Sequence, residues 1–136
     1  MKNLLCLILL SILAIACGDK EQDDLFFNEG DIVGNWRLIE TLLDPGDGSG
    51  VYKPSTLNVN LEIFDDGSVL SNGMLCGLGE SVNGQVQHGQ FYVEDSLITS
   101  SCDSLPYSLG VNHIDTILIL SYPCIEPCLV KFEKSL

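Results

Sequence analysis

Basic side chains are scarce in this sequence. Its 136 residues contain six Lys and Arg against 19 Asp and Glu, and the net charge is −13. Binding to nucleic acid depends on Lys and Arg that neutralise phosphates, so we expect no nucleic-acid partner. An anionic lipid surface would also repel so acidic a chain, and the chain has no basic patch that could bind to such a surface. The acidity is therefore interpreted as a means of staying soluble.

Groups that serve catalysis are also few. His88 and His113 are the two histidines, and both lie beside turn residues. The nucleophile elbow Gly-x-Ser-x-Gly is absent, and the sequence around Ser49 reads Gly-Asp-Gly-Ser-Gly. If the cysteines form disulfides, they are not available as nucleophiles either. We therefore expect a protein that is not an enzyme and that needs no cofactor.

A hydrophobic run long enough to span a bilayer is missing as well. Residues 4–16 supply 13 mostly apolar residues, interrupted by Ser11, whereas a spanning helix needs about 20. Lys2 precedes the run and a small residue, Ala16, ends it. A cation, a short apolar core and a small residue form the pattern of a secretory signal peptide. The sequence predicts such a signal over residues 1–16.

The residue after that signal is Cys17, and Leu13-Ala14-Ile15-Ala16-Cys17 resembles the lipobox of bacterial lipoproteins. The resemblance implies that the mature chain begins at Cys17, whose sulfur carries a diacylglycerol and whose fatty acids, such as palmitate, hold it to a membrane. Without residues 1–16 the chain keeps 5 Lys and Arg against 19 acids, a charge of −14. Attachment must then come from the lipid.

Residues 17–29 are predicted to be the lipidated cysteine and a flexible acidic tether, because residues 18–24 are charged and lack an apolar anchor. The acidic run also resembles the export signal of some outer-membrane lipoproteins; an ordinary solvated spacer is the alternative. The resemblance implies an outer-membrane lipoprotein of the bacterial cell envelope, either periplasmic or surface-exposed.

Four cysteines remain once Cys6 leaves with the signal and Cys17 carries lipid: Cys76, Cys102, Cys124 and Cys128. An even number in an exported domain indicates two disulfides. Of three possible pairings we expect Cys124 with Cys128, where two prolines bend the chain back, and hence Cys76 with Cys102. A structural zinc site is the alternative, although the paired C-x2-C spacing is missing.

Helical periodicity is absent after the signal, apart from one turn near residues 24–29. Instead, short β-prone runs alternate with turns: residues 57–63 alternate strictly between apolar and polar, and Asp65-Asp66-Gly67 is typical of a hairpin. The 120 residues from 17 onward suffice for one domain. The sequence predicts an all-β domain over residues 30–136, a small antiparallel barrel or a sandwich of eight strands. The runs are residues 36–43, 57–63, 68–71, 90–93, 97–100, 105–111, 116–122 and 129–133.

Gly34-Asn35-Trp36 at the head of the first strand resembles the first motif of the lipocalin family. The resemblance implies an eight-stranded up-and-down barrel whose closed end is covered by Trp36 beneath an N-terminal helical turn. It also implies a basic side chain from the last strand stacked on Trp36, for which Lys131 is the counterpart. The chain is similar to small lipocalin-like lipoproteins, and more weakly to the META-type domain around Cys76 and Cys102.

Two functions follow from this interpretation. In the first, the barrel binds a small apolar or amphipathic molecule in its mouth, since eight strands enclose just enough room for side chains or one small ligand. The lining residues would then include Leu61, Ile63, Tyr92 and Ile119.

In the second, the domain is an interaction module that presents loops to a protein or glycan, using residues 44–50 and the loop from Cys124 to Cys128, with Ile125 and Glu126 at its tip. Asp44, Asp47 and Ser49 also offer oxygen ligands that could hold calcium, although a glycine-rich connector is the expected interpretation of that loop.

Overall fold

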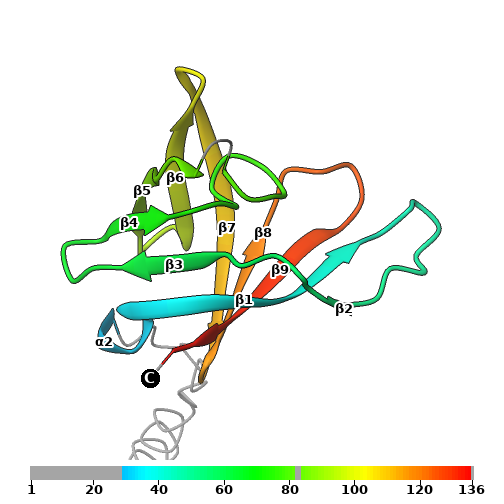
Figure 1. Cartoon of the computed structure of the whole chain (residues 1–136), viewed down its shortest axis with the longest axis horizontal. Helices are drawn as coiled ribbons and strands as arrows, with labels where there is room; N and C mark the ends of the chain where they lie inside the picture. The colour runs from blue at the N-terminus through cyan, green and yellow to red at the C-terminus, as the bar shows by residue number, and fades with distance from the viewer. Residues whose placement is uncertain (1–28, 82–83, 136) are drawn as a thin grey trace, which may run out of the picture.

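The computed structural model describes residues 29–81 and 84–135 of the chain. One short helix and nine strands make up this part (Figure 1). The predicted signal, Cys17 and most of the tether lie outside the described residues. Among the described residues, no helix has the length and hydrophobicity to cross a bilayer. The elements are α2 (Glu29–Ile32), β1 (Gly34–Leu43), β2 (Lys53–Pro54), β3 (Asn60–Ile63), β4 (Ser68–Ser71), β5 (Gln87–Tyr92), β6 (Leu97–Cys102), β7 (Leu105–Ile114), β8 (Ile117–Ser121) and β9 (Cys128–Lys134).

The strands close into an eight-stranded antiparallel barrel, so the predicted all-β fold is confirmed. Each strand from β3 to β8 pairs with the next in sequence, and β1 pairs with both β3 and β9 to close the barrel. The two-residue β2 lies outside the eight and extends the β3 side of β1. The order is that of an up-and-down barrel, and every pairing is antiparallel.

Tight turns at the strand ends follow from local chemistry. Gly67 has a φ of +79°, and a Cβ there would lie 2.9 Å from the carbonyl oxygen of Phe91. Only glycine fits that turn without displacing the neighbouring strand. The hairpin between β6 and β7 instead places Asp103 and Ser104 at positive φ, at +52° and +66°. Two successive residues at positive φ form the type I′ turn that matches the twist of adjacent strands.

The core fills the inside of the barrel, and the alternation of buried and exposed positions builds it. In β8, Leu118 and Leu120 are buried and their neighbours are partly exposed. Successive strand residues point to opposite faces, so every second residue reaches the interior. The buried apolar set is Ile32, Trp36, Leu38, Val59, Leu61, Ile63, Val69, Met74, Leu75, Phe91, Ile98, Leu109, Val111, Leu118, Leu120, Tyr122, Val130 and Phe132.

One end of the barrel, which we call the closed end, is covered by α2 and Trp36. The indole N–H of Trp36 donates to the carbonyl oxygen of Ile32 over 2.9 Å, which joins the helix to the first strand. The ring of His113 meets Trp36 edge-on, with ring centroids 5.4 Å apart. Trp36 is fully buried there, in the place that the lipocalin resemblance implies.

The basic residue expected over Trp36 was identified wrongly. Lys134 lies there, with its ammonium nitrogen 5.4 Å from the ring centre. Lys131 instead contacts the ring of Tyr52, 3.5 Å from its centre, and forms a 2.8 Å ion pair with Glu40. The register explains the error, because Trp36 is paired with Lys134, whereas Lys131 is paired with Glu40 further along β1.

Candidate functional site at the loop end of the barrel

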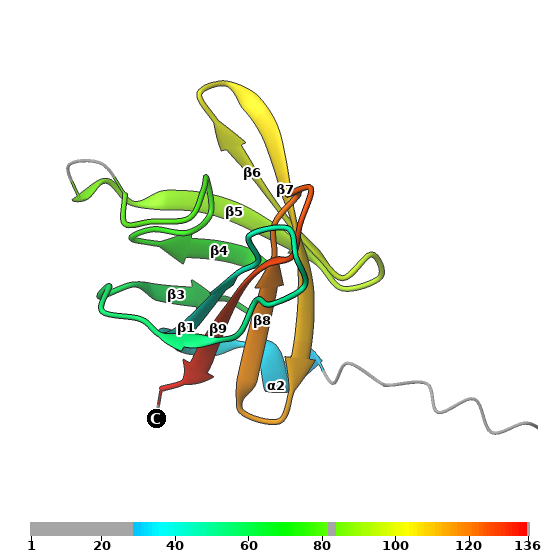
Figure 2. The same cartoon turned by 90° about the vertical axis from the view of Figure 1, so that its right-hand side faces the viewer.

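The end opposite α2, which we call the loop end, carries the longest connections. The loops after β1, β4 and β8 all leave the barrel there, as does the hairpin between β6 and β7 (Figures 1 and 2). Most of the exposed large apolar side chains belong to the same end, whereas Tyr92 and Ile114 lie at the closed end. Those at the loop end are Leu43, Val51, Leu57, Leu78, Val86, Leu105 and Ile125.

Two of these connections, predicted separately as binding loops, pack against each other. The backbone N–H of Asp44 donates to the carbonyl oxygen of Pro127 over 3.1 Å. A Cβ on Gly46 would lie 3.6 Å from the Cγ of Glu126. The pairing of Leu43 with Cys128 brings them together, because it places the end of β1 beside the start of β9. We call residues 44–50 and Cys124–Cys128 together the loop surface.

Ile125 is the most exposed apolar side chain of the loop surface, with a relative accessibility of 101%. It lies inside a short ring closed by the Cys124–Cys128 disulfide, whose Cα atoms are 6.0 Å apart. The ring and the prolines at 123 and 127 restrict the backbone on both sides of Ile125. A constrained loop loses less conformational entropy when it binds, so this tip is preorganised for contact.

Asp44 organises the neighbouring loop. One oxygen of its carboxylate accepts the N–H groups of Gly46 and Gly48, at 2.8 and 3.1 Å, and the other accepts the N–H of Gly50 at 2.9 Å. These bonds stabilise the charged carboxylate, with the bond from Gly46 contributing most, and lower the pKa of Asp44 below its usual 3.8. The loop is thus held by a side chain of its own first residue.

The calcium interpretation of this loop is not supported by its geometry. Both oxygens of Asp44 accept backbone N–H groups, and one oxygen of Asp47 accepts the N–H of Ser49 over 2.9 Å. Amide hydrogens therefore point to the place where a cation would need carbonyl oxygens. Among residues 29–81 and 84–135, no three acidic, histidine or cysteine side chains gather as metal ligands would.

A pH titration tests this role of Asp44. Since its pKa is lowered on folding, the ionised carboxylate stabilises the loop above about pH 3.8, and this contribution is lost as the pH falls through the folded-state pKa. We expect the amide signals of Gly46, Gly48 and Gly50 to shift together, with one midpoint below 3.8, in NMR spectra. Asp44→Asn should remove the transition, and Asp65→Asn in the opposite turn should leave it intact; separate midpoints would contradict the shared role.

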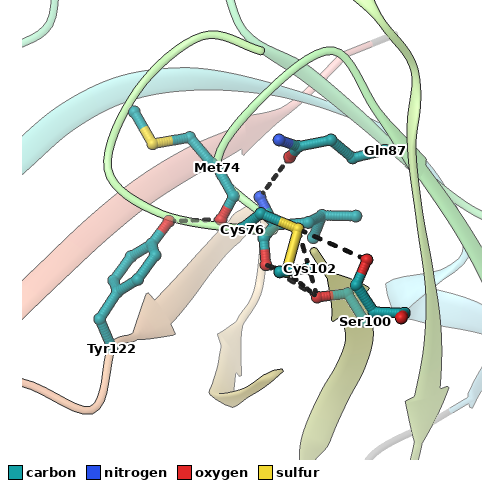
Figure 3. The surroundings of a disulfide bond; sticks show 8 residues. Met74, Cys76, Gln87, Ser100, Cys102 and Tyr122 are labelled. Carbon is teal, nitrogen blue, oxygen red and sulfur yellow. Dashed lines mark hydrogen bonds between the residues drawn. A yellow bond between two sulfur atoms is a disulfide. The ribbon is translucent and has the colours of Figure 1, made fainter. Parts of the chain in front are cut away.

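The mouth of the barrel at the loop end is filled by the chain itself. Met74 and Leu75, in the loop after β4, are buried among the core residues. The side-chain hydroxyl of Tyr122 donates to the carbonyl oxygen of Met74 over 2.7 Å, and that of Ser100 donates to the carbonyl oxygen of Leu75 over 2.9 Å (Figure 3). We call residues 73–79 the plug.

The plug is fitted closely to the strands around it. The N–H of Leu75 donates to the side-chain oxygen of Gln87 over 2.8 Å. A Cβ on Gly89 would lie 3.5 Å from a methyl carbon of Leu75, an ordinary contact distance, so the Leu75 side chain packs directly against β5. Burial raises the pKa of the Tyr122 hydroxyl, which therefore stays protonated and donates at neutral pH.

Both predicted disulfides are confirmed. Cys76 at the plug is bonded to Cys102 at the end of β6, with Cα atoms 5.5 Å apart (Figure 3), and Cys124 is bonded to Cys128. The first ties the plug to the barrel wall and the second closes the ring around Ile125. Because these four cysteines form two disulfides, none of them has a free thiolate to bind zinc, and the zinc alternative is excluded.

Two of the four predicted ligand-lining residues point the wrong way. Leu61 and Ile63 do face the interior, but they are buried in the packed core. Tyr92 is 48% exposed because Phe91 occupies the inward position, and Ile119 faces outward between Leu118 and Leu120. The errors arise because residues 117–120 are all apolar and residues 91–92 are both aromatic, so no alternation in the sequence marks the inward face of these strands.

In the described part, a hollow lies at each end of the barrel. The first, of about 600 Å³, lies outside the plug between residues 76–81, 85–88 and 101–103, and includes His88. The second, of about 180 Å³, lies beside Ile32, Phe64 and Phe91 at the closed end. Neither is a chamber inside the barrel, because core side chains and the plug occupy that space.

Fold and site together define a class: a small closed β-barrel with a plugged mouth and a disulfide-supported loop surface. No protein-family model matches this chain, and none of the curated proteins matches it either.

Proposed function

We propose that this chain is a lipid-anchored, non-catalytic protein of the bacterial cell envelope, lipocalin-like in architecture, and that its loop surface binds a protein partner. The observation that carries the proposal is the contact between residues 44–50 and the Cys124–Cys128 ring. It joins two predicted binding loops into one surface with Ile125 fully exposed at its tip.

The alternative, a small apolar ligand held in the barrel mouth, fits the geometry less well. Such a ligand needs a connected apolar cavity of roughly 300 Å³ or more. Leu61 and Ile63 are instead packed in the core, and Met74 and Leu75 occupy the mouth. A ligand could enter only if the plug left.

The position of the chain's entry supports the proposed orientation. Residue 29 begins α2 at the closed end, and β1 runs from there to the loop end (Figure 1). An anchor at Cys17 would therefore hold the closed end towards the membrane and leave the loop surface directed away from it. The lipid supplies the attachment that the acidic chain cannot.

The chemistry of the surface favours a protein with an apolar pocket and basic surroundings. Ile125 offers an apolar anchor, and Glu126 follows it in the chain as an exposed acid. Asp47, also exposed, lies in the loop that packs against Glu126. Exposed apolar side chains within a polar rim are the common anatomy of protein interfaces. A glycan partner fits this surface less well, because sugar rings commonly stack on aromatic side chains and residues 44–50 and 124–128 contain none.

Site-specific crosslinking tests the proposal. A photoreactive amino acid is placed at position 125 and, as a matched control, at position 114, an isoleucine that is 55% exposed at the closed end. We expect one envelope protein to be crosslinked from position 125 only, and the crosslink to be lost when Glu126→Lys is added. The same products from both positions, or binding to purified envelope glycan that Ile125→Ser abolishes, would refute a protein partner at this surface.

A further inference from the structure

The plug is attached to the barrel differently from the strands. Strands of the barrel are joined by ladders of backbone hydrogen bonds, for example five paired positions between β8 and β9. Met74 and Leu75 are held instead by single side-chain groups of Tyr122, Ser100 and Gln87. Apart from the peptide chain itself, the Cys76–Cys102 disulfide is the only covalent link between the described residues of the plug and the wall.

The backbone of the plug is also strained. Met74 has a φ of +67°, a left-handed conformation that a residue with a side chain rarely adopts. Such a conformation persists where surrounding contacts impose it, and it favours release once they weaken. Burial of the Met74 and Leu75 side chains opposes release. Because strain favours release of the plug and burial opposes it, we expect the Cys76–Cys102 disulfide to decide whether the plug stays in the barrel mouth.

The same disulfide is reached from solvent. Cys76 is exposed, and both Cys76 and Cys102 line the 600 Å³ hollow at the loop end. A thiolate must approach a disulfide sulfur directly to exchange with it, so access of this kind is the first requirement for reduction. Cys124 is also exposed, but the Cys124–Cys128 bond differs in what it holds: it closes a five-residue ring and fixes no buried segment.

We propose that Cys76–Cys102 is a thiol–disulfide exchange site for an external dithiol, and that its reduction releases the plug from the barrel mouth. One thiolate of the dithiol attacks the Sγ of Cys76, a mixed disulfide forms, and Cys102 leaves as a thiolate. The second thiolate of the dithiol then attacks the mixed disulfide and frees Cys76. The dithiol is oxidised to its disulfide, and its two protons end on Cys76 and Cys102.

The consequence is a barrel that is closed when oxidised and opens reversibly when reduced. Because Met74 and Leu75 are buried, the reduced plug alternates between the bound and released positions rather than leaving permanently. The strands remain paired, since none of their ladders includes residues 74 and 75. This inference does not depend on the proposed protein partner, because it concerns a different connection.

Hydrogen exchange measured by mass spectrometry on the full chain in detergent tests the proposal, before and after treatment with dithiothreitol, a dithiol. The amide of Leu75, which donates to the side chain of Gln87 on β5 in the oxidised protein, should exchange at least about 100-fold faster after reduction. Amides of β8 and β9 should keep their rates. Alkylation of the new thiols confirms that the bond was broken.

Two variants assign the effect to one disulfide. Cys124→Ser with Cys128→Ser should behave as the wild type, closed until the dithiol is added. Cys76→Ser with Cys102→Ser should exchange rapidly at Leu75 without it; if this variant does not fold, treatment of the prefolded wild type decides. Slow exchange at Leu75 after proven reduction, equal acceleration in β8 and β9, or a bond that dithiothreitol reduces only in denaturant would each overturn the proposal.

Discussion

Replacement of Trp36 by alanine is expected to lower the free energy of unfolding by about 3–5 kcal/mol, the usual cost of removing a large buried aromatic side chain. Trp36 is fully buried, joins α2 to β1 through the carbonyl oxygen of Ile32, and contacts both His113 and Lys134. A loss of this size is a large fraction of the free energy of unfolding of an ordinary domain, which is about 5–15 kcal/mol. Urea unfolding followed by circular dichroism measures it.

Trp36→Phe separates the two contributions of the indole. Phenylalanine keeps most of the apolar contact but leaves the Ile32 carbonyl oxygen without its donor, which costs about 1–3 kcal/mol where such a group stays buried. The loss should therefore be smaller than that of Trp36→Ala. If the alanine variant were as stable as the wild type, Trp36 would not be the cover of the closed end.

Replacement of Cys17 by serine is expected to abolish membrane attachment altogether. Each buried CH2 of an acyl chain contributes about 0.8 kcal/mol to membrane binding, so loss of several chains leaves nothing that holds so acidic a protein to a membrane. The variant should appear in the soluble fraction without incorporated palmitate, whereas the wild type should label with palmitate and sediment with membranes.

Cys6→Ser is the matched control for this experiment, since Cys6 lies within residues 1–16, the predicted signal peptide, and would leave with it. It should leave both palmitate labelling and sedimentation unchanged. A Cys17→Ser protein that still carried palmitate, or that remained with the membranes after salt washing, would show that the anchor is not a lipid on Cys17.

Most of the barrel could be predicted from the sequence because its strands carry local signals. The alternation in residues 57–63 and the turn at Asp65-Asp66-Gly67 indicated β3, β4 and the hairpin between them, and all three are present. Closure of the barrel has no such local signal, because the pairing of β1 with β9 joins residues almost a hundred positions apart. Closure was instead predicted from the number of strands and from the family resemblance.

The same reasoning could not place side chains that depend on register. Lys131 and Lys134 lie on the same strand, three residues apart, but the strand predicted from the sequence ended at residue 133 and offered only Lys131. Which of them lies over Trp36 depends on the pairing and on the irregularity between Leu38 and Glu40 in β1. No local pattern in the sequence reports such a shift.

The plug was missed because its residues resemble an ordinary loop. In the segment from Gly73 to Gly79, three glycines bracket an apolar pair and a cysteine, and glycine-rich segments usually lie on the surface. The signal that could have revealed it is the combination of Met74 and Leu75 with the adjacent Cys76. An apolar pair beside a disulfide has a covalent reason to be held against the core.

The central claim is that the oxidised barrel is closed to small molecules and that the protein acts through its outer loop surface. Native mass spectrometry of the full protein, purified in detergent from the cells that make it, tests this most directly. The account predicts a mass equal to that of the lipidated chain with two disulfides and nothing further. An additional mass that remains bound in the native spectrum and is lost on denaturation would contradict it, because such a ligand would have to occupy the space assigned to the core and the plug.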